Sequence, residues 1–167
     1  SFPTRRSSDL SKRHLIWYTN CQSLLANLPS IKVFISEVTP KILMLSETRT
    51  IPNMTDNELS IPNYSLFRID SENRHTGGVA VYVHSSVKID LFDCFSQQNI
   101  WSISFKILFG YPKETFCLIY RGHKSTHSDF TSFIDRSCEI LSSKSSNFHL
   151  IGDFNYDFND KSKSATL

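Results

Sequence analysis

"LIGDFN", residues 150–155, passes from apolar residues through a glycine to Asp153 and Asn155. A short apolar run bounded by turn-forming residues predicts a buried strand. Gly, Asp and Asn also favour ordinary turns, which is the simpler interpretation of the polar residues that end this run. A functional interpretation becomes stronger if other buried strands end in the same way.

Three further apolar runs also end in polar groups. They are "HLIWYTN" (14–20) with Asn20, "KILMLSET" (41–48) with Glu47, and "TFCLIYR" (115–121) with Tyr120 and Arg121. The ends of strands and the loops after them are where α/β proteins commonly build their sites. We therefore expect these polar groups to converge on one crevice together with Asp153 and Asn155.

Helical patterns and further strands fill the rest of the chain. Apolar residues recur at helical spacing from Leu24 to Val38, where Pro29 is expected to be tolerable only in the first turn. A second helix is expected from about 128 to 142, and a Pro-, Asn- and Asp-rich loop at about 51–63. Additional strands are expected at 63–70, at "VAVYV" (79–83), and in an alternating run at 101–106. This order predicts a mixed-sheet α/β or α+β domain.

Length and composition predict one globular domain. The chain has 167 residues, of which 40% are hydrophobic. A formal charge of +2 permits a nucleic-acid partner without requiring one. No apolar stretch approaches the roughly 20 residues needed to cross a bilayer, so no membrane partner is expected. Structural zinc is not expected and the spacing implies no disulfide, because the four cysteines lie far apart and form no CxxC pair, at Cys21, Cys94, Cys117 and Cys138.

The two ends of the sequence differ from the part between them. Residues 1–13 are expected to be a leader foreign to the fold, because "SFPTRRSSDL" shares no periodicity with the rest of the chain and reads like a translated sequencing adapter. Residues 161–167 are expected to be a polar tail. The domain itself is expected to span 14–160, with Asp157 and Asp160 as solvated turn acids.

The gathered polar groups favour metal-assisted phosphate chemistry. Glu47 and Asp153 are hard oxygen donors that suit Mg²⁺, with Mn²⁺ as an alternative, and Mg²⁺ binds through one or two carboxylates together with substrate phosphate. Asn20 and Asn155 add neutral groups that can contact metal, water or phosphate. Phosphate or DNA binding is expected from three arginines: Arg68, Arg74 and Arg121. This set suits phosphodiester hydrolysis.

An ordered series of segments makes the interpretation more specific. The segments are "YTNCQS", "LSET", "NYSLFRID", "RHTGGVAVYV", "LIYR" and "LIGDFN". Together, over about residues 14–158, they resemble the endonuclease domain of non-LTR retrotransposons, in the exonuclease-endonuclease-phosphatase superfamily with apurinic/apyrimidinic endonucleases and DNase I. The resemblance implies a DNase I-like four-layer α/β sandwich with mixed β-sheets, here incomplete.

The resemblance also implies roles for individual residues. Glu47 would be the metal-binding acid, with Asn20 as its neighbour at the metal. Tyr120 would contact the scissile phosphate, Asp153 would position or activate the attacking water, and Asn155 would support the phosphate. The segment with Tyr64, Arg68 and Asp70 would be structural or DNA-facing, and the pair Gly77–Gly78 is expected to serve close backbone packing or a bulge.

Two departures from the family pattern affect these expectations. Gly122 stands where typical members have proline, which puts the local turn in doubt. The closing Ser-Asp-His motif, with its catalytic histidine and a further metal-site aspartate, has no counterpart in this sequence and would have to lie downstream. No histidine occupies that position among His14, His75, His84, His123, His127 and His149. His149 lies inside the predicted strand, where a structural role is expected.

The leading functional hypothesis is a Mg²⁺-dependent endonuclease that nicks target DNA, leaving an end from which a reverse transcriptase can prime. A reverse transcriptase domain would then belong to the full-length protein, and access to target DNA would place it in the nucleus. One alternative is a catalytically dead remnant of the domain with weak nucleic-acid or partner binding. Another is a superfamily hydrolase that acts on a phosphoinositide or sphingolipid.

Overall fold

The computed structural model describes residues 16–109 and 114–156. The expected leader and tail, His14, Asp157 and Asp160 lie outside the described residues. The elements in chain order are β1 (Ile16–Asn20), α1 (Leu24–Val38), β2 (Ile42–Ser46), β3 (Tyr64–Ile69), β4 (Val79–His84), β5 (Lys88–Gln97), β6 (Ile100–Phe109), β7 (Thr115–Arg121), α2 (His127–Lys144) and β8 (Phe148–Asp153).

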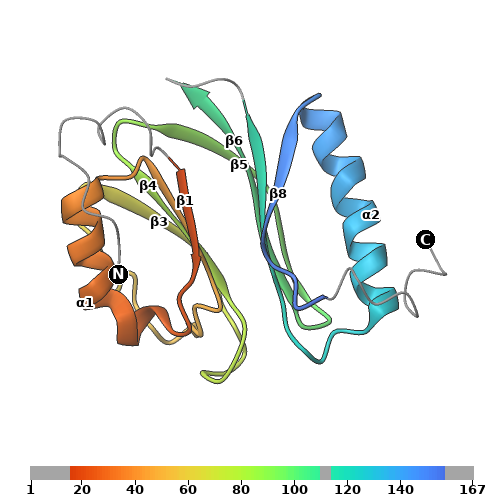
Figure 1. Ribbon diagram of the computed structural model, residues 1–167, viewed down its shortest axis with the longest axis horizontal. Coiled ribbons are helices and arrows are strands. Elements are labelled where there is room, and N and C mark those ends of the chain that lie inside the picture. The colour runs from red at the N-terminus through yellow and green to blue at the C-terminus, as the bar shows by residue number, and fades with distance from the viewer. Residues whose placement is uncertain (1–15, 110–113, 157–167) are drawn as a thin grey trace.

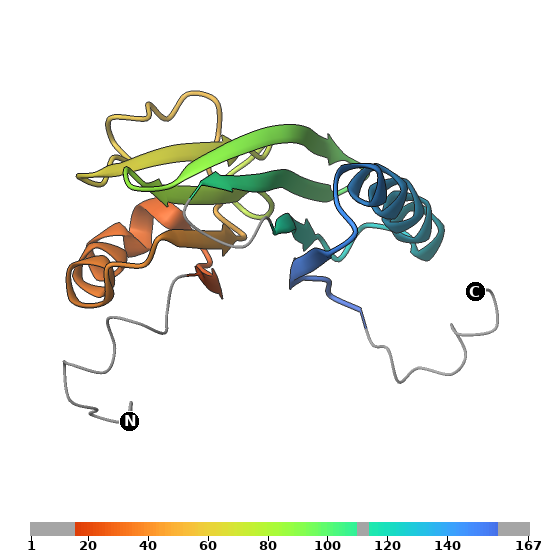
Figure 2. The ribbon, with the colours of Figure 1, turned by 90° about the horizontal axis from the view of Figure 1, so that it is seen from above.

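Two four-stranded mixed sheets form the centre of the molecule, with the strand orders β1-β2-β4-β3 and β5-β6-β7-β8. β1 and β2 are parallel, as are β7 and β8, and all other neighbours are antiparallel. Parallel neighbours require a crossover connection, which α1 supplies in one sheet and α2 in the other. The sheets face each other with one helix on each outer side (Figures 1 and 2). This confirms the expected four-layer α/β sandwich.

Apolar contacts join the four layers. Between the sheets, the inward side chains of β2 and β4 pack against those of β6 and β7, with Met44, Val81, Phe105 and Leu118 among them. The outer face of the first sheet packs on α1, and that of the second sheet packs on α2. β2 and β7 are buried along their whole length, which explains why they read as continuous apolar runs and not as alternating ones.

Helix α1 differs from its expectation at Pro29, which lies in the second turn and not in the first. The helix begins at Leu24 because that side chain is fully buried and its N–H donates to the Thr48 carbonyl at 2.8 Å. Proline removes only the bond to the Leu25 carbonyl. Leu25 and Pro29 both lie on the exposed face of the helix, where solvent can satisfy that carbonyl.

Helix α2 confirms the second helical expectation and is slightly longer than expected. Its first turn is fixed by an N-cap, a side chain that accepts from a free backbone N–H at the helix start. Thr126 accepts from the Asp129 N–H at 3.1 Å, and its hydroxyl donates to the Asp129 carboxylate at 2.6 Å. Phe130, Phe133 and Leu141 form the buried stripe that holds the helix against the second sheet.

The strand β5 was not predicted from the sequence. It is the edge strand of the second sheet, and most of its side chains are at least partly exposed, including Asp90 and Asp93. Acidic residues are depleted in strands, so the pattern carries little strand signal. The neighbouring β6 also differs from the alternation expected at 101–106, because Trp101–Phe105 are buried throughout.

The glycine pair before β4 confirms the expected close packing. Gly77 and Gly78 both have positive φ, at 91° and 83°. A Cβ at Gly77 would lie 2.5 Å from the Trp101 ring, and one at Gly78 would overlap the Thr48 hydroxyl. Within the described residues, no helix is long and apolar enough to span a membrane.

Gly152 offers a test of the close approach between β7 and β8. A Cβ at this position would overlap the Ile119 carbonyl of the neighbouring strand. We expect Gly152→Ala to lower the free energy of unfolding by about 3 kcal/mol or more, as measured by urea denaturation. The matched control is Gly122→Ala, whose Cβ would meet its nearest atom at 3.3 Å, with an expected loss of about 1 kcal/mol. Equal unfolding midpoints for the two variants would contradict this account.

Candidate functional site

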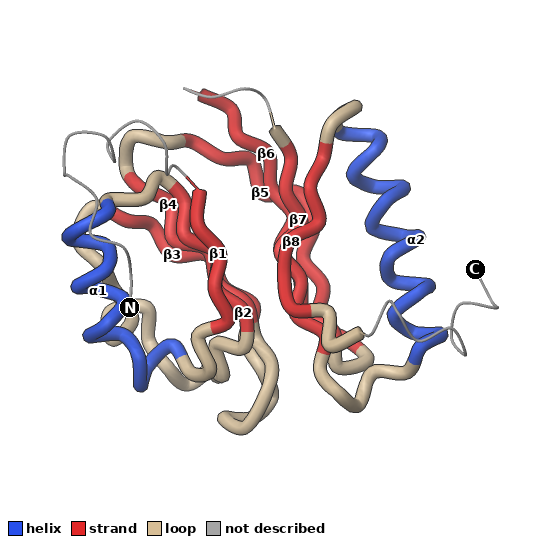
Figure 3. The backbone as a smooth tube through the Cα atoms, in the orientation of Figure 1, coloured by secondary structure: helices blue, strands red, loops and turns tan. Residues whose placement is uncertain are grey.

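The candidate site lies where β1, β2 and β8 end, at the same end of the two sheets (Figure 3, lower end). In the first sheet, Asn20 is paired in register with Ser46, so the residues that come after β1 and β2 lie next to each other. The loops after these two strands are tied together, since the Ser23 N–H donates to the Glu47 carbonyl at 3.0 Å. In the second sheet, Tyr120 is paired with Asp153.

The side-chain amide of Asn20 joins the two acids. Its Nδ2 donates to Glu47 Oε2 at 3.0 Å and to Asp153 Oδ2 at 2.8 Å, while its Oδ1 accepts from the Gln22 N–H at 3.1 Å. Glu47 belongs to one sheet and Asp153 to the other, so this amide links the sheets. The expected convergence is confirmed for these three side chains. Because Asn20 presents hydrogens to both acids and its oxygen accepts from Gln22, it orients the two carboxylates, and its expected place at the metal stays a prediction.

The loop that presents Glu47 has an unusual backbone. Glu47 and Arg49 both have a φ of 53°, in the left-handed region that non-glycine residues rarely adopt. The loop is held in this form by Gly77 and Gly78, whose carbonyls accept from the N–H groups of Arg49 at 2.8 Å and Thr48 at 3.2 Å. Backbone strain of this kind occurs preferentially at functional sites.

Arg49 is a member of the site that was not predicted from the sequence. Its Nη2 lies 2.5 Å from Glu47 Oε1, and its Nε donates to the same oxygen at 3.2 Å. The two residues are only two positions apart, and they meet because the loop turns back through positive φ. A residue-type pattern does not indicate that turn, so no sequence signal was available.

Tyr120 lies beside the acids and is almost fully buried. Burial raises the pKa of its hydroxyl, and the negative charges of Glu47 and Asp153 raise it further. Its oxygen lies 3.2 Å from Thr76 Oγ1. Tyr120 therefore remains protonated at neutral pH and keeps a hydroxyl hydrogen that it can donate.

Asn155 holds the end of β8 and does not point into the site. Its N–H donates to Asp153 Oδ1 at 3.1 Å, and its Nδ2 donates to the Arg121 carbonyl at 2.6 Å. The Asp153 carboxylate therefore receives one hydrogen bond on each oxygen, from Asn155 and from Asn20. The role that this geometry gives Asn155 is to position Asp153, and its expected support of a phosphate stays a prediction.

Two of the three arginines expected to bind DNA are structural. The Arg121 guanidinium is buried, donates to the carbonyls of Asn155 and Ser125 at 2.8 and 2.7 Å, and lies over the Phe130 ring. Arg68 is occupied by Asp70 and by backbone carbonyls of the 51–54 segment, in line with the structural alternative for its segment. Arg74 is exposed and stays a candidate for DNA contact.

The turn after β7 explains the glycine that replaces the usual proline. The Gly122 N–H donates to the Asn99 carbonyl at 2.7 Å, a bond that proline cannot make. The expected structural role of His149 is supported, because its ring stacks on Phe116. Within 16–109 and 114–156, no histidine is hydrogen-bonded to Glu47, Asp153 or Tyr120.

The donor chemistry of the site fits a hard cation. Glu47 and Asp153 supply carboxylate oxygens, and no third His, Cys, Asp or Glu joins them in the described part of the chain. Mg²⁺ commonly uses only one or two carboxylates and completes its shell with water and phosphate. Burial raises the pKa of the nearby Cys21 thiol to about 11, so this sulfur is protonated at neutral pH.

The fold of this chain is similar to that of several solved structures. No protein-family model and no curated protein matches the chain. TDP2 of D. rerio, complexed with single strand DNA product, superposes with a TM-score of 0.60 at 14% identity, over 85% of this chain and 60% of that one. An AP endonuclease from Archaeoglobus fulgidus has a TM-score of 0.59 at 18% identity, over 84% and 56%. The 3′ phosphatase NExo from Neisseria, bound to a product DNA hairpin, has a TM-score of 0.57 at 16% identity, over 84% and 56%.

These similarities confirm the DNase I-like sandwich that the sequence resemblance implied. At identities of 14–18% they show the fold alone. The chain spans 56–60% of the length of these three neighbours.

The ion pair between Arg49 and Glu47 predicts that Arg49 and a metal ion compete for the Glu47 carboxylate. Arg49→Gln removes a cation from the carboxylate, so we expect Mn²⁺ to bind about two- to fivefold more tightly, which corresponds to ~0.4–1 kcal/mol. The affinity is measured by calorimetric titration. Arg136→Gln is the control, because Arg136 pairs with Asp93 elsewhere and the change in net charge is the same. Unchanged or weaker binding in Arg49→Gln would show that Arg49 does not compete with metal.

Proposed function

We propose that this protein is a metal-dependent phosphodiester hydrolase that acts on DNA. The observation that carries the proposal is the pair of carboxylates from opposite sheets, Glu47 and Asp153, which share the Asn20 amide. The names of the structural neighbours support it, since they include an endonuclease and a phosphatase and describe bound DNA products.

Glu47 and Asp153 would hold the metal, which we propose to be Mg²⁺ or Mn²⁺. When bound, such an ion stabilises charge on phosphate oxygens and lowers the pKa of a water. Asn20 keeps the two carboxylates in place through its amide hydrogens. Arg49 supplies positive charge next to the Glu47 carboxylate, where it can attract an anionic substrate.

Tyr120 and Asp153 would act on the substrate itself. The protonated Tyr120 hydroxyl can donate to a phosphate oxygen, and its low exposure makes that hydrogen bond stronger than it would be in water. Asp153 would orient the attacking water. Its carboxylate is fixed by hydrogen bonds on both oxygens, from Asn20 and Asn155, so little reorganisation is needed when the substrate binds.

The more specific proposal is an element-encoded endonuclease that nicks target DNA to prime reverse transcription. The ordered sequence segments support this role, and they favour the retrotransposon branch over the lipid phosphatases. One observation favours the non-catalytic alternative: no histidine contacts the acids in the part of the chain that the structure describes. Sequencing the downstream reading frame tests the role directly, since Ser-Asp-His and then a reverse transcriptase are expected there.

Nicking of supercoiled plasmid tests the hydrolase proposal. We expect slow, Mg²⁺-dependent conversion to the open circle, with complete loss on chelation. Glu47→Gln and Asp153→Asn should each reduce the rate about 10²-fold or more, because each removes a carboxylate that would hold the metal. The rate is expected to be low because no described histidine assists the acids.

The control for this experiment is Glu139→Gln, which makes the same change at an exposed position on α2. It should nick at the rate of the unmodified chain. Nicking that survives in both Glu47→Gln and Asp153→Asn would overturn the proposed site. Binding of DNA without any nicking would favour the non-catalytic alternative.

A further inference from the structure

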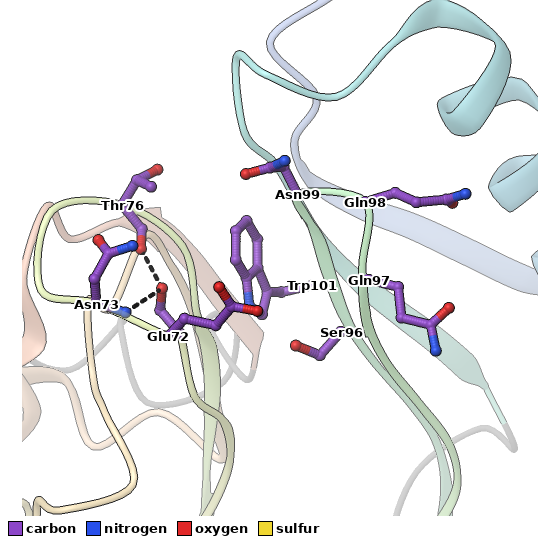
Figure 4. A pocket seen from close by; sticks show the side chains of 9 residues that line it. Glu72, Asn73, Thr76, Ser96, Gln97, Gln98, Asn99 and Trp101 are labelled. Carbon is purple, nitrogen blue, oxygen red and sulfur yellow. Dashed lines mark hydrogen bonds between the residues drawn. The ribbon is translucent and has the colours of Figure 1, made fainter.

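A polar pocket lies beside the candidate site, between two loops that the proposed function does not use. One wall is formed by the β3–β4 loop at residues 71–76, and the other by the β5–β6 turn at 96–99, with Trp101 between them (Figure 4). Its volume is about 150 Å³. A cavity of this size in another protein holds a benzene ring, so the pocket suits one six-membered ring and not a larger ligand.

The pocket is connected to the site through Tyr120. Thr76 lines the pocket, and its hydroxyl oxygen lies 3.2 Å from the Tyr120 hydroxyl. Trp101 is paired with Tyr120 in the sheet register, and their ring centroids are 5.8 Å apart. A substrate strand whose phosphate meets Tyr120 would therefore bring a neighbouring nucleotide to this pocket.

The chemistry of the pocket fits a base and not a phosphate. Figure 4 shows the Glu72 carboxylate and the Asn99 amide directed toward the space beside Trp101. Glu72 would repel a phosphate, whereas carboxylates accept from the amino group of cytosine and Asn pairs with base edges. Within the described residues, the side chains of Glu72 and Asn99 make no hydrogen bond, and the buried Trp101 indole N–H has no partner. The Glu72 and Asn99 side chains are therefore available to a ligand.

The wall that carries Asn99 is a tight hairpin turn that is tied to the end of β7. Gln98 and Asn99 both have positive φ, at 55° and 57°, as in the two-residue hairpin turn whose twist matches the flanking strands. The Asn99 carbonyl accepts from the Gly122 N–H, which fixes the turn to the end of β7. Arg74 is exposed in the opposite loop, where it could hold the phosphate of the same nucleotide.

We propose that this pocket binds one unpaired nucleobase of the DNA strand next to the scissile phosphate, and that Glu72 makes it prefer cytosine to thymine. The inference rests on the proposed function, because it takes DNA as the substrate. Cytosine offers an amino hydrogen to Glu72, whereas thymine presents a carbonyl oxygen in the same place.

Equilibrium binding to short single strands tests the pocket. The probes are fluorescein-labelled thymine 12-mers, either unchanged or with one central cytosine, titrated with the full chain at fixed salt and with Ca²⁺ in place of Mg²⁺. We expect the single cytosine to tighten binding about fivefold, at the lower end of one base-specific contact. Glu72→Gln should bind both strands equally. Asn99→Gly, which removes the amide and suits a positive φ, should also reduce the preference.

Asn57→Ala, a change of an exposed amide in the 51–63 loop, is the matched control and should keep the preference for cytosine. A preference that persists in Glu72→Gln, or no preference in the unmodified chain, would overturn the pocket assignment while plasmid nicking remains intact. Failure of the unmodified chain to bind either strand, together with absent nicking, would instead overturn the proposed function.

Discussion

One hydrogen-bonded amide holds the candidate site together. Two carboxylates brought to the same place repel each other, and the Asn20 side chain counteracts this by giving one hydrogen to Glu47 and one to Asp153. These acids come from different sheets, so the geometry is correct only when both sheets pack at the right depth. The pairing of Asn20 with Ser46 and of Tyr120 with Asp153 sets where each strand end lies within its own sheet.

Neighbouring protein groups stabilise the negative charge of the two acids. Arg49 neutralises the outer oxygen of Glu47, and the Asn155 N–H supports Asp153 from its own loop. Burial and the same negative charge raise the pKa of the Tyr120 hydroxyl, which therefore keeps its proton. The site therefore combines fixed acceptors for a cation with a fixed donor for an anion, which is the arrangement that phosphate chemistry requires.

The sequence predicted those parts of the structure that depend on local pattern. The central strands were recognised because strands buried on both faces read as continuous apolar runs, and their polar last residues indicated the site. Edge strand β5 was missed, because exposure removes that pattern. The roles of Arg49 and Arg121 could not be predicted, since the partner of a long charged side chain is decided by tertiary packing. The direction of the Asn20 amide depends on the Gln22 N–H in the same way.

The separation of Asn20 from Asp153 along the chain has a consequence for folding. They are 133 positions apart, whereas each sheet forms from a hairpin and a strand–helix–strand crossover that are close in sequence. Contacts between distant segments form late, because the entropy of closing the intervening chain must be overcome first. Neither half alone contains both acids. The paired carboxylates therefore exist only in the fully docked chain, and a partly folded or nascent chain has no complete candidate site.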